Sequence, residues 1–322
     1  MQSQKATLVG YSTKIITSRE FFSFAALVAL TIVAAFLSPR FLTFANWRNL
    51  LSQVAIIAVL AVGQTYVILT GGIDLSVGAV LALSGAFTAY MMKTGGVHPY
   101  LAILLGLLVG TACGLINGIF VTKMKIPSFV ATLAMMAAAR GGALIITGGT
   151  PISIFPPQIT SLASYWGPIS GLVFIMLGVY VLGQFILSKT RYGRYVYALG
   201  GNEEAARYAG LPADRVKLFV FAFCGFCAAL GGIMMIARLD SAYPTAGEGF
   251  ELDAIASAVL GGVSFAGGIG SLVGTFFGSL IMACLNNILN LMRVSAFYQY
   301  IARGIVLALA AVSLSKGTKF AK

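Results

Sequence analysis

Long uncharged runs constrain the fold of this chain more than any other feature of its sequence. They lie at 49–73, 75–92, 99–122, 141–188, 218–237 and 254–292. A helix of about 20 apolar residues crosses the hydrocarbon core of a bilayer. A further uncharged run at 21–38 is longer than the core of a typical signal peptide, so we interpret it as an uncleaved first helix. Together these runs predict a polytopic membrane protein.

The composition favours helices in lipid over a soluble domain. Hydrophobic residues make up 59% of the chain and charged residues only 9%, whereas soluble domains carry about 25% charged residues. The runs are apolar on every face and do not alternate as the strands of a membrane barrel do. We therefore predict an all-α fold with about ten transmembrane helices in a single domain, 1–322.

The helix boundaries follow from the apolar runs and the charges between them. We predict helices at about 21–38, 50–70, 75–92, 99–122, 127–147, 168–187, 217–237, 251–265, 270–291 and 296–314. Basic residues are concentrated in the connections of one side, which face the cytoplasm by the positive-inside rule. These residues are Lys5, Lys14, Arg19, Lys123, Lys125, Lys189, Arg191, Arg194, Arg207, Arg215, Lys217, Lys316, Lys319 and Lys322. The bias predicts that both termini are cytoplasmic.

The net charge of +12 does not indicate a nucleic-acid partner. A nucleic-acid interface needs basic residues gathered on one surface, and here they fall mainly in short connections between apolar runs. We therefore exclude nucleic acid and expect membrane lipid as the surrounding partner.

An internal repeat is visible. Gly-Leu-Leu-Val-Gly-Thr-Ala-Cys-Gly at 106–114 parallels Gly-Ser-Leu-Val-Gly-Thr-Phe-Phe-Gly at 270–278, and each is followed by Ala-Arg-Gly, at 139–141 and 302–304. The copies begin at helices of opposite parity, so the halves, about 21–147 and 168–314, are expected to be inverted in the membrane. The four-residue spacing of the glycines predicts helix-packing seams, with a lining role in a transport path as the alternative.

Each half of the repeat also contains a pair of glycines and an arginine within an apolar run. Gly71-Gly72 and Gly261-Gly262 precede related glycines and predict helix breaks, and Asp74 is expected to cap the helix after the first break. Arg140 and Arg303 are the repeat-related charges within apolar runs. Each is expected either to bond the ends of broken helices or to meet a polar ligand.

Sequence motifs typical of catalytic, nucleotide-binding or metal sites are absent. The sequence contains no G-x-x-x-x-G-K-[ST] phosphate loop, no H-E-x-x-H motif and no nucleophile elbow in a suitable context. The only histidine is His98, and the four cysteines lie inside apolar runs. We therefore predict no catalytic site, no metal and no cofactor in this chain, so that any nucleotide hydrolysis belongs to another subunit.

The longest charged segment lies between two apolar runs, at 189–217. Within it, Asn202 is placed to cap a short helix at 203–209, with Glu203 and Glu204 in the first turn and Gly210 at the end. A short helix lying flat on the inner face of the membrane suits the docking of a cytosolic motor. An inert loop is the alternative.

Several of these motifs resemble the permeases of bacterial ATP-binding-cassette monosaccharide importers. Glu204-Ala205-Ala206 followed by Gly210 resembles the E-A-A-x-x-x-G coupling element. Further similar stretches lie at 69–78, 200–203, 244–247, 251–255 and 261–262, and the similarity covers nearly the whole chain. One departure is that Leu211-Pro212 follows Gly210 at once, so we expect a shorter coupling helix than in the older pattern.

The resemblance implies a fold and a set of partners. It implies a helix arrangement like that of the vitamin B12 importer, in the bacterial inner membrane, with a second permease subunit that is either identical or related. A periplasmic sugar-binding protein would deliver ribose or a related monosaccharide. A cytosolic ATPase with two fused modules would bind ATP and Mg and would contact Asn202, Glu203, Glu204, Ala205, Ala206 and Gly210.

The sugar path is the least determined part of the sequence. A neutral sugar needs amides, hydroxyls and apolar walls, and Asn117, Asn286, Asn287 and Asn290 lie near helix ends, where they either line the path or bond neighbouring helices. With Arg140 and Arg303 they are our candidates for the path. The alternative functions are a proton-coupled sugar carrier and a passive facilitator; a carrier would depend on Asp74 or Glu251.

Overall fold

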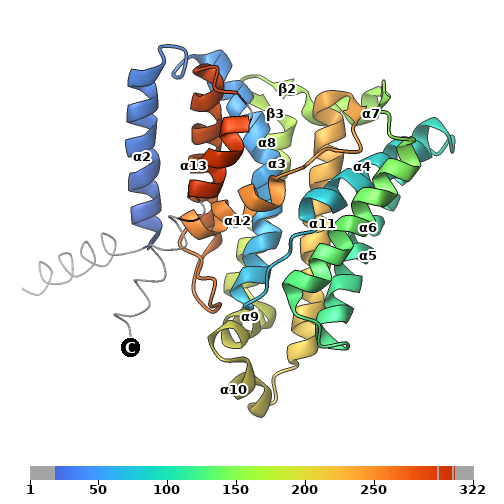
Figure 1. The fold of residues 1–322 in the computed structure, drawn as a ribbon, viewed down its shortest axis with the longest axis vertical. Helices are drawn as coiled ribbons and strands as arrows, with labels where there is room; N and C mark the ends of the chain where they lie inside the picture. Colours follow the sequence, from blue (N-terminus) through green and yellow to red (C-terminus); the bar gives the residue numbers. More distant parts are fainter. Residues whose placement is uncertain (1–18, 296, 307, 309–322) are drawn as a thin grey trace, which may run out of the picture.

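A computed structural model of the chain describes residues 19–295, 297–306 and 308, which are mostly helical (Figure 1). The bundle consists of α2 (Arg19–Leu37), α3 (Phe44–Leu69), α4 (Val77–Lys93), α5 (Pro99–Thr122), α6 (Ser128–Thr147), α8 (Gly171–Lys189), α11 (Ala213–Leu239), α12 (Phe250–Leu260) and α13 (Leu272–Leu291). Residues 297–306 are also helical. Positions 296, 307 and 309–314 of the last predicted helix lie outside the described residues. So do the basic residues at both ends of the sequence, apart from Arg19.

Seven helices of the described chain are long and apolar enough to cross a membrane, namely α2, α3, α5, α6, α8, α11 and α13. The chain is a polytopic all-α membrane protein. Helices α4 and α12 are shorter, with 17 and 11 residues. Helix α4 begins directly after a break in an apolar run, and α12 ends directly before one. Both helices are therefore short because the chain breaks there, although the apolar sequence continues.

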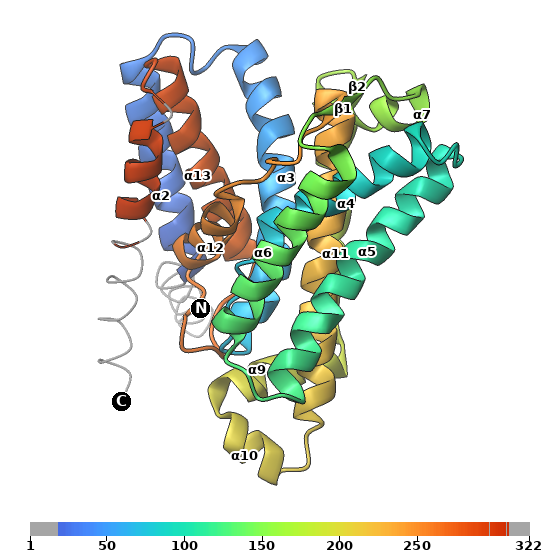
Figure 2. The same cartoon turned by 45° about the vertical axis from the view of Figure 1, so that its right-hand side comes forward.

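Burial separates the central helices from the peripheral ones. In α3, 89% of the apolar window is buried inside the protein, and in α2 only 11%. Figures 1 and 2 show α3 and α11 in the middle of the bundle, with α2 and α13 on one side and α5 and α6 on the other. The outer helices expose leucine, isoleucine and phenylalanine, which in a bilayer face lipid.

Two predicted boundaries differ from the structure by five or more residues, and local chemistry explains both. Helix α12 ends at Leu260 instead of 265, because the chain turns at Gly261 and Gly262, where Gly262 has a φ of +88°. Helix α3 begins at Phe44 instead of 50. Thr43 caps it by accepting a hydrogen bond from the Asn46 N–H at 3.4 Å, and the charge of Arg48 lies over the ring of Tyr165.

Glycines at four-residue intervals on one helix face let neighbouring helices approach closely. A methyl group at Gly110 or Gly114 of α5 would overlap α11, one at Gly278 of α13 would overlap α12, and one at Gly274 would overlap Gly261, directly after α12. Lipid gives helices no hydrophobic reason to associate, so close backbone approach supplies the contact. The prediction that these glycines are packing seams is confirmed.

The segment 189–217 forms two short helices at one end of the bundle, α9 (Arg191–Gly201) and α10 (Glu203–Tyr208) (Figure 1). We predicted α10 from the sequence but not α9. The signal was present, because Gly193, Val196 and Leu199 recur every three residues and all three are buried. We call this end of the bundle the α10 end.

The opposite end carries two two-stranded sheets and a short helix. Strand β1 (Ile152–Ser153) pairs antiparallel with β4 (Ser241–Ala242), and β2 (Tyr165–Trp166) pairs with β3 (Ile169–Ser170), near α7 (Pro157–Thr160) and the 3₁₀ turn η1 (Ser161–Ala163). The β1–β4 pairing joins the proline-rich connection after α6 to the acidic connection after α11.

Candidate functional site

Helix α10 begins and ends where the sequence predicts. The Asn202 side-chain oxygen accepts a hydrogen bond from the Ala205 N–H at 2.9 Å, and Gly210 adopts a φ of +79° after the last turn. Ala206 is 5% exposed and faces the bundle, whereas Glu204, Ala205 and Tyr208 are exposed. The predicted cap and helix are confirmed, and α10 presents an outward face at the α10 end.

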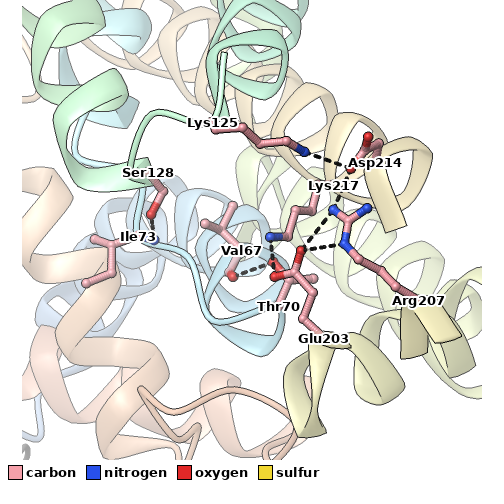
Figure 3. A network of polar contacts seen from close by, with 9 residues as sticks. All are labelled: Val67, Thr70, Ile73, Lys125, Ser128, Glu203, Arg207, Asp214 and Lys217. Carbon is pink, nitrogen blue, oxygen red and sulfur yellow. Dashed lines mark hydrogen bonds and ion pairs between the residues drawn. The ribbon is translucent and has the colours of Figure 1, made fainter. Parts of the chain in front are cut away.

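A network of ion pairs fixes α10 to the bundle (Figure 3). The Lys217 ammonium donates to the Glu203 carboxylate at 2.6 Å, and the Arg207 guanidinium donates to Glu203 at 3.0 Å and to Asp214 at 2.6 Å. Lys125, between α5 and α6, lies 3.9 Å from Asp214. The network joins α10 to the start of α11 and, more loosely, to the α5–α6 connection.

The electrostatics of Glu203 and Arg207 agree with this pairing. Partial burial alone raises the pKa of Glu203, but Lys217 and Arg207 outweigh it, and the pKa of Glu203 lies below its ordinary value. Hydrogen bonds to Asp214 and Glu203 raise the pKa of Arg207. Both residues therefore stay charged at neutral pH.

The two glutamates of α10 have different roles in the structure. Glu203 binds Lys217 and Arg207, while Glu204 makes no hydrogen bond or ion pair with the described residues. The i, i+4 spacing of Glu203 and Arg207 is a sequence signal for their contact. The contact with Lys217 had no such signal, because it depends on how α11 returns past α10.

A cavity of about 660 Å³ lies beside this network. It is bordered by Glu203, Arg207 and Lys217 on one side and by Gly71, Gly72 and Ser128 on the other. The cavity therefore separates α10 from the first helix break.

The first break, between α3 and α4, is closed by backbone hydrogen bonds at Gly71 and Gly72 and then by side chains. Asp74 is 1% exposed, and its carboxylate accepts from the Ser76 N–H at 2.8 Å and from the Ser76 hydroxyl at 2.6 Å. From α6, Ser128 accepts from the Ile73 N–H at 3.1 Å and Thr132 from the Leu75 N–H at 3.1 Å. Asp74 thus bonds the residue at the start of α4, and α6 supplies the partners of the Ile73 and Leu75 N–H groups.

The second break, between α12 and α13, is closed mainly by backbone. The Ser264 N–H donates to the Ile269 carbonyl at 2.9 Å, and the Gly267 N–H donates to the Ser264 carbonyl at 3.0 Å. Ser271 then caps α13 by accepting from the Gly274 N–H at 3.1 Å. The Gly268 N–H also donates to the Leu69 carbonyl at 2.9 Å, so the two breaks are in direct contact.

Each repeat-related arginine contacts a segment near the start of α12. Arg140 contacts the connection before α12, and Arg303 contacts its first turn. The Arg140 guanidinium donates to the carbonyls of Pro244 and Ala246, at 2.7 and 2.9 Å. Arg303 lies 3.4 Å from the fully buried carboxylate of Asp253 and donates to the Asn286 side chain at 3.4 Å. Asp253 was not among the predicted site residues, although its position close to Glu248 and Glu251 is visible in the sequence.

Each candidate asparagine has a protein partner. Asn117 is fully buried and donates to the Ser76 hydroxyl at 3.0 Å, and Asn287 exchanges two hydrogen bonds of 2.9 Å with Asn46. Asn290 accepts from the Gln299 amide at 2.8 Å. The structure thus places these residues in contacts between elements, and of the four Asn290 is the exposed one.

Comparison with known proteins identifies the family. Residues 46–311 match the family model of the permease component of branched-chain amino acid transport systems. The chain belongs to this permease family. The permease is 44% identical over 293 residues to the ribose import permease of Escherichia coli K12, covering 89% of this chain and 91% of the relative.

Two further relatives span similar lengths. The permease is 47% identical over 292 residues to the ribose import permease of Bacillus subtilis 168, covering 89% of this chain and 90% of the relative. It is 41% identical over 291 residues to the D-allose transport permease of Escherichia coli K12, covering 88% of each. The resemblance that the sequence motifs indicated is confirmed.

Proposed function

We propose that this chain is the membrane-spanning subunit of an ATP-driven importer of a monosaccharide, either ribose or a related sugar. The observation that carries the proposal is the similarity to ribose import permeases over 89% of the chain. The exposed face of α10 supports it, because Glu204 lies there without a partner among the described residues. ATP and Mg bind to a separate ATPase in this proposal.

Helix α10 is the docking element for that ATPase. Its outward residues, Glu204, Ala205 and Tyr208, are available to a partner, while Ala206 and Glu203 hold the helix on the bundle. Within the predicted set, Asn202 and Gly210 shape the ends of α10. The double-module ATPase binds below, and a periplasmic binding protein delivers the sugar at the opposite end, near the β1–β4 connection.

The proposal also includes the arrangement of the helices and subunits in the membrane. The ten helices form two inverted halves, about 21–147 and 168–314, in a fold like that of the vitamin B12 importer. Two permease subunits, identical or related, enclose the sugar path in the inner membrane, with their termini in the cytoplasm. The halves exchange outward and inward openings when ATP closes the ATPase modules.

The sugar path runs along α13 and the 297–306 helix. Asn286, Asn290 and Arg303 offer amide and guanidinium groups there, and Asn287 lies next to them on α13. Asn117 and Arg140 support the path indirectly by holding Ser76 and the carbonyls of the 244–246 connection. An Asn287→Ala variant with unchanged transport and unchanged sugar-stimulated ATPase activity would remove Asn287 from the path.

Co-purification through a C-terminal tag tests the proposal. We expect a double-module ATPase to co-purify with the wild-type permease, and Glu204→Lys to lose it because the substitution reverses the charge of the docking face. Glu248→Lys, at an exposed position in the connection between β4 and α12, is the matched control and should retain the ATPase. A chain that purifies alone and transports in liposomes without ATP would instead be a facilitator or a proton-coupled carrier.

A further inference from the structure

The last turn of α9 lies against both helix breaks. A methyl group at Gly200 would overlap the Leu69 carbonyl oxygen and the Gly268 amide nitrogen. These two atoms form the 2.9 Å hydrogen bond that joins the breaks. Figures 1 and 2 both show the connection between α12 and α13 reaching down toward α9 and the lower end of α3.

A second contact lies one turn earlier in α9. The Tyr197 hydroxyl donates to the Gly270 carbonyl at 2.9 Å. Residues three apart share a helix face, so Tyr197 and Gly200 address the second break from the same side of α9. Tyr197 holds the end of the break that precedes α13, while Gly200 touches its middle.

We propose that Gly200, assisted by Tyr197, is the contact through which a displacement of α10 reaches both helix breaks. The inference rests on the proposed function, in which an ATPase moves α10. Only Asn202 separates α9 from α10, so a shift of α10 carries the end of α9 with it. Gly200 is a positioning residue and touches neither sugar nor nucleotide.

The local packing suits this role. Backbone lies directly on backbone at Gly200, so no side chain is present that could rotate away and absorb the displacement. The cavity of about 660 Å³ is bordered by Gly200, Glu203 and the first break, which leaves room for α9 and α10 to move. Energetic coupling between sites is carried by packed, rigid elements, and Gly200 packs α9 directly on both breaks.

The neighbouring glycine provides a matched control. A methyl group at Gly201 would meet no atom within 4 Å, and neither Gly200 nor Gly201 has a positive φ. Alanine therefore changes helix propensity alike at both positions. Only at Gly200 does it disturb the contact with the breaks.

The test compares Gly200→Ala and Gly201→Ala in the permease together with the ATPase that co-purifies with it. We expect Gly200→Ala to lower sugar uptake per ATP hydrolysed by about tenfold or more while the ATPase still co-purifies. Gly201→Ala should retain the wild-type ratio. Tyr197→Phe should lower it by about threefold, because one hydrogen bond is lost and the ring is kept.

Hydrogen exchange gives a readout that a loss of stability alone would not reproduce. With ATP and orthovanadate, we expect exchange to change at 203–208, at 69–76 and at 262–271 in the wild type and in Gly201→Ala. In Gly200→Ala the change should remain at 203–208 and vanish at both breaks. If Gly200→Ala does not fold, Tyr197→Phe and the wild-type exchange pattern carry the test.

Two failures are distinguishable. Loss of the ATPase from every preparation, or absence of any exchange change at 203–208 in the wild type, contradicts the proposed function. A wild-type change at 203–208 with unchanged exchange at both breaks overturns the inference alone. Coupled transport by Gly200→Ala at the wild-type ratio overturns it as well.

Discussion

The two helix breaks have related glycine pairs in sequence but are closed by different means. The break after α3 relies on the Asp74 carboxylate and on hydroxyl groups from α6. The break after α12 relies on its own backbone turns and on glycines that let α12 and α13 approach. The first is therefore sensitive to loss of polar side chains and the second to added volume.

This difference has a physical origin. Non-helical backbone inside a membrane is tolerated only where its N–H and C=O groups have partners. At the first break α6 runs alongside and supplies them. At the second, the chain folds back on itself and also satisfies the Leu69 carbonyl at the end of α3.

The largest expected effect is that of Asp74→Ala. The substitution leaves the buried Ser76 N–H and hydroxyl without their acceptor, which should cost about 3 kcal/mol of stability, measured by unfolding in detergent. Ser264→Ala at the second break removes only a 3.3 Å contact with the Ala266 N–H and should cost less than 1 kcal/mol, as a rough estimate. Equal losses in the two variants would contradict the comparison.

For substitutions that add volume, we expect the second break to lose more stability than the first. In Gly261→Ala the methyl group meets the backbone of Gly274, whereas in Gly72→Ala it meets the Val67 side chain at 3.1 Å. We expect Gly261→Ala to cost about 2 kcal/mol and Gly72→Ala roughly half as much, by the same unfolding measurement. Gly178→Ala, which has open space around it, is the control.

A smaller effect tests the contribution of α6. Thr132→Val keeps the shape of the side chain but removes the acceptor for the Leu75 N–H, which should cost about 1 kcal/mol. Hydrogen exchange should increase at Leu75 and stay unchanged at 261–271. Increased exchange at both breaks would mean that they open as one unit.

The smallest effect concerns the ion network of α10. The folded-state pKa of Glu203 lies below its unfolded value, so its pairing contributes stability above the unfolded pKa, about 4.3, and loses it as the pH falls through the folded pKa. The protection of 203–208 against hydrogen exchange, taken relative to the intrinsic exchange rate at each pH, should therefore fall at acid pH and at high salt. Glu203→Gln should reduce this response, with the Arg207–Asp214 pair carrying what remains, and Glu204→Gln should leave it unchanged, since of the two glutamates only Glu203 is paired.

The sequence predicted the local features that depend on neighbouring residues. The capping of α10 by Asn202, its end at Gly210 and the turn at Gly261-Gly262 each follow from a few adjacent residues. The glycine seams were predictable because a four-residue spacing places small residues on one helix face. The boundaries of α3 and α12 were missed where a cap or a turn outweighed the apolar pattern.

By itself, the sequence determined that the chain is helical, lies in the membrane and contains two related glycine pairs, because each depends on composition or on spacing of a few residues. Only the tertiary structure decided which partners close each break, which of the two α10 glutamates is held by Lys217, and that Gly200 lies on the Leu69–Gly268 contact. The Glu203–Lys217, Ile73–Ser128 and Leu69–Gly268 contacts join residues 14, 55 and 199 positions apart, and their geometry depends on how all the helices pack. A local sequence pattern does not predict contacts between residues so far apart in the chain.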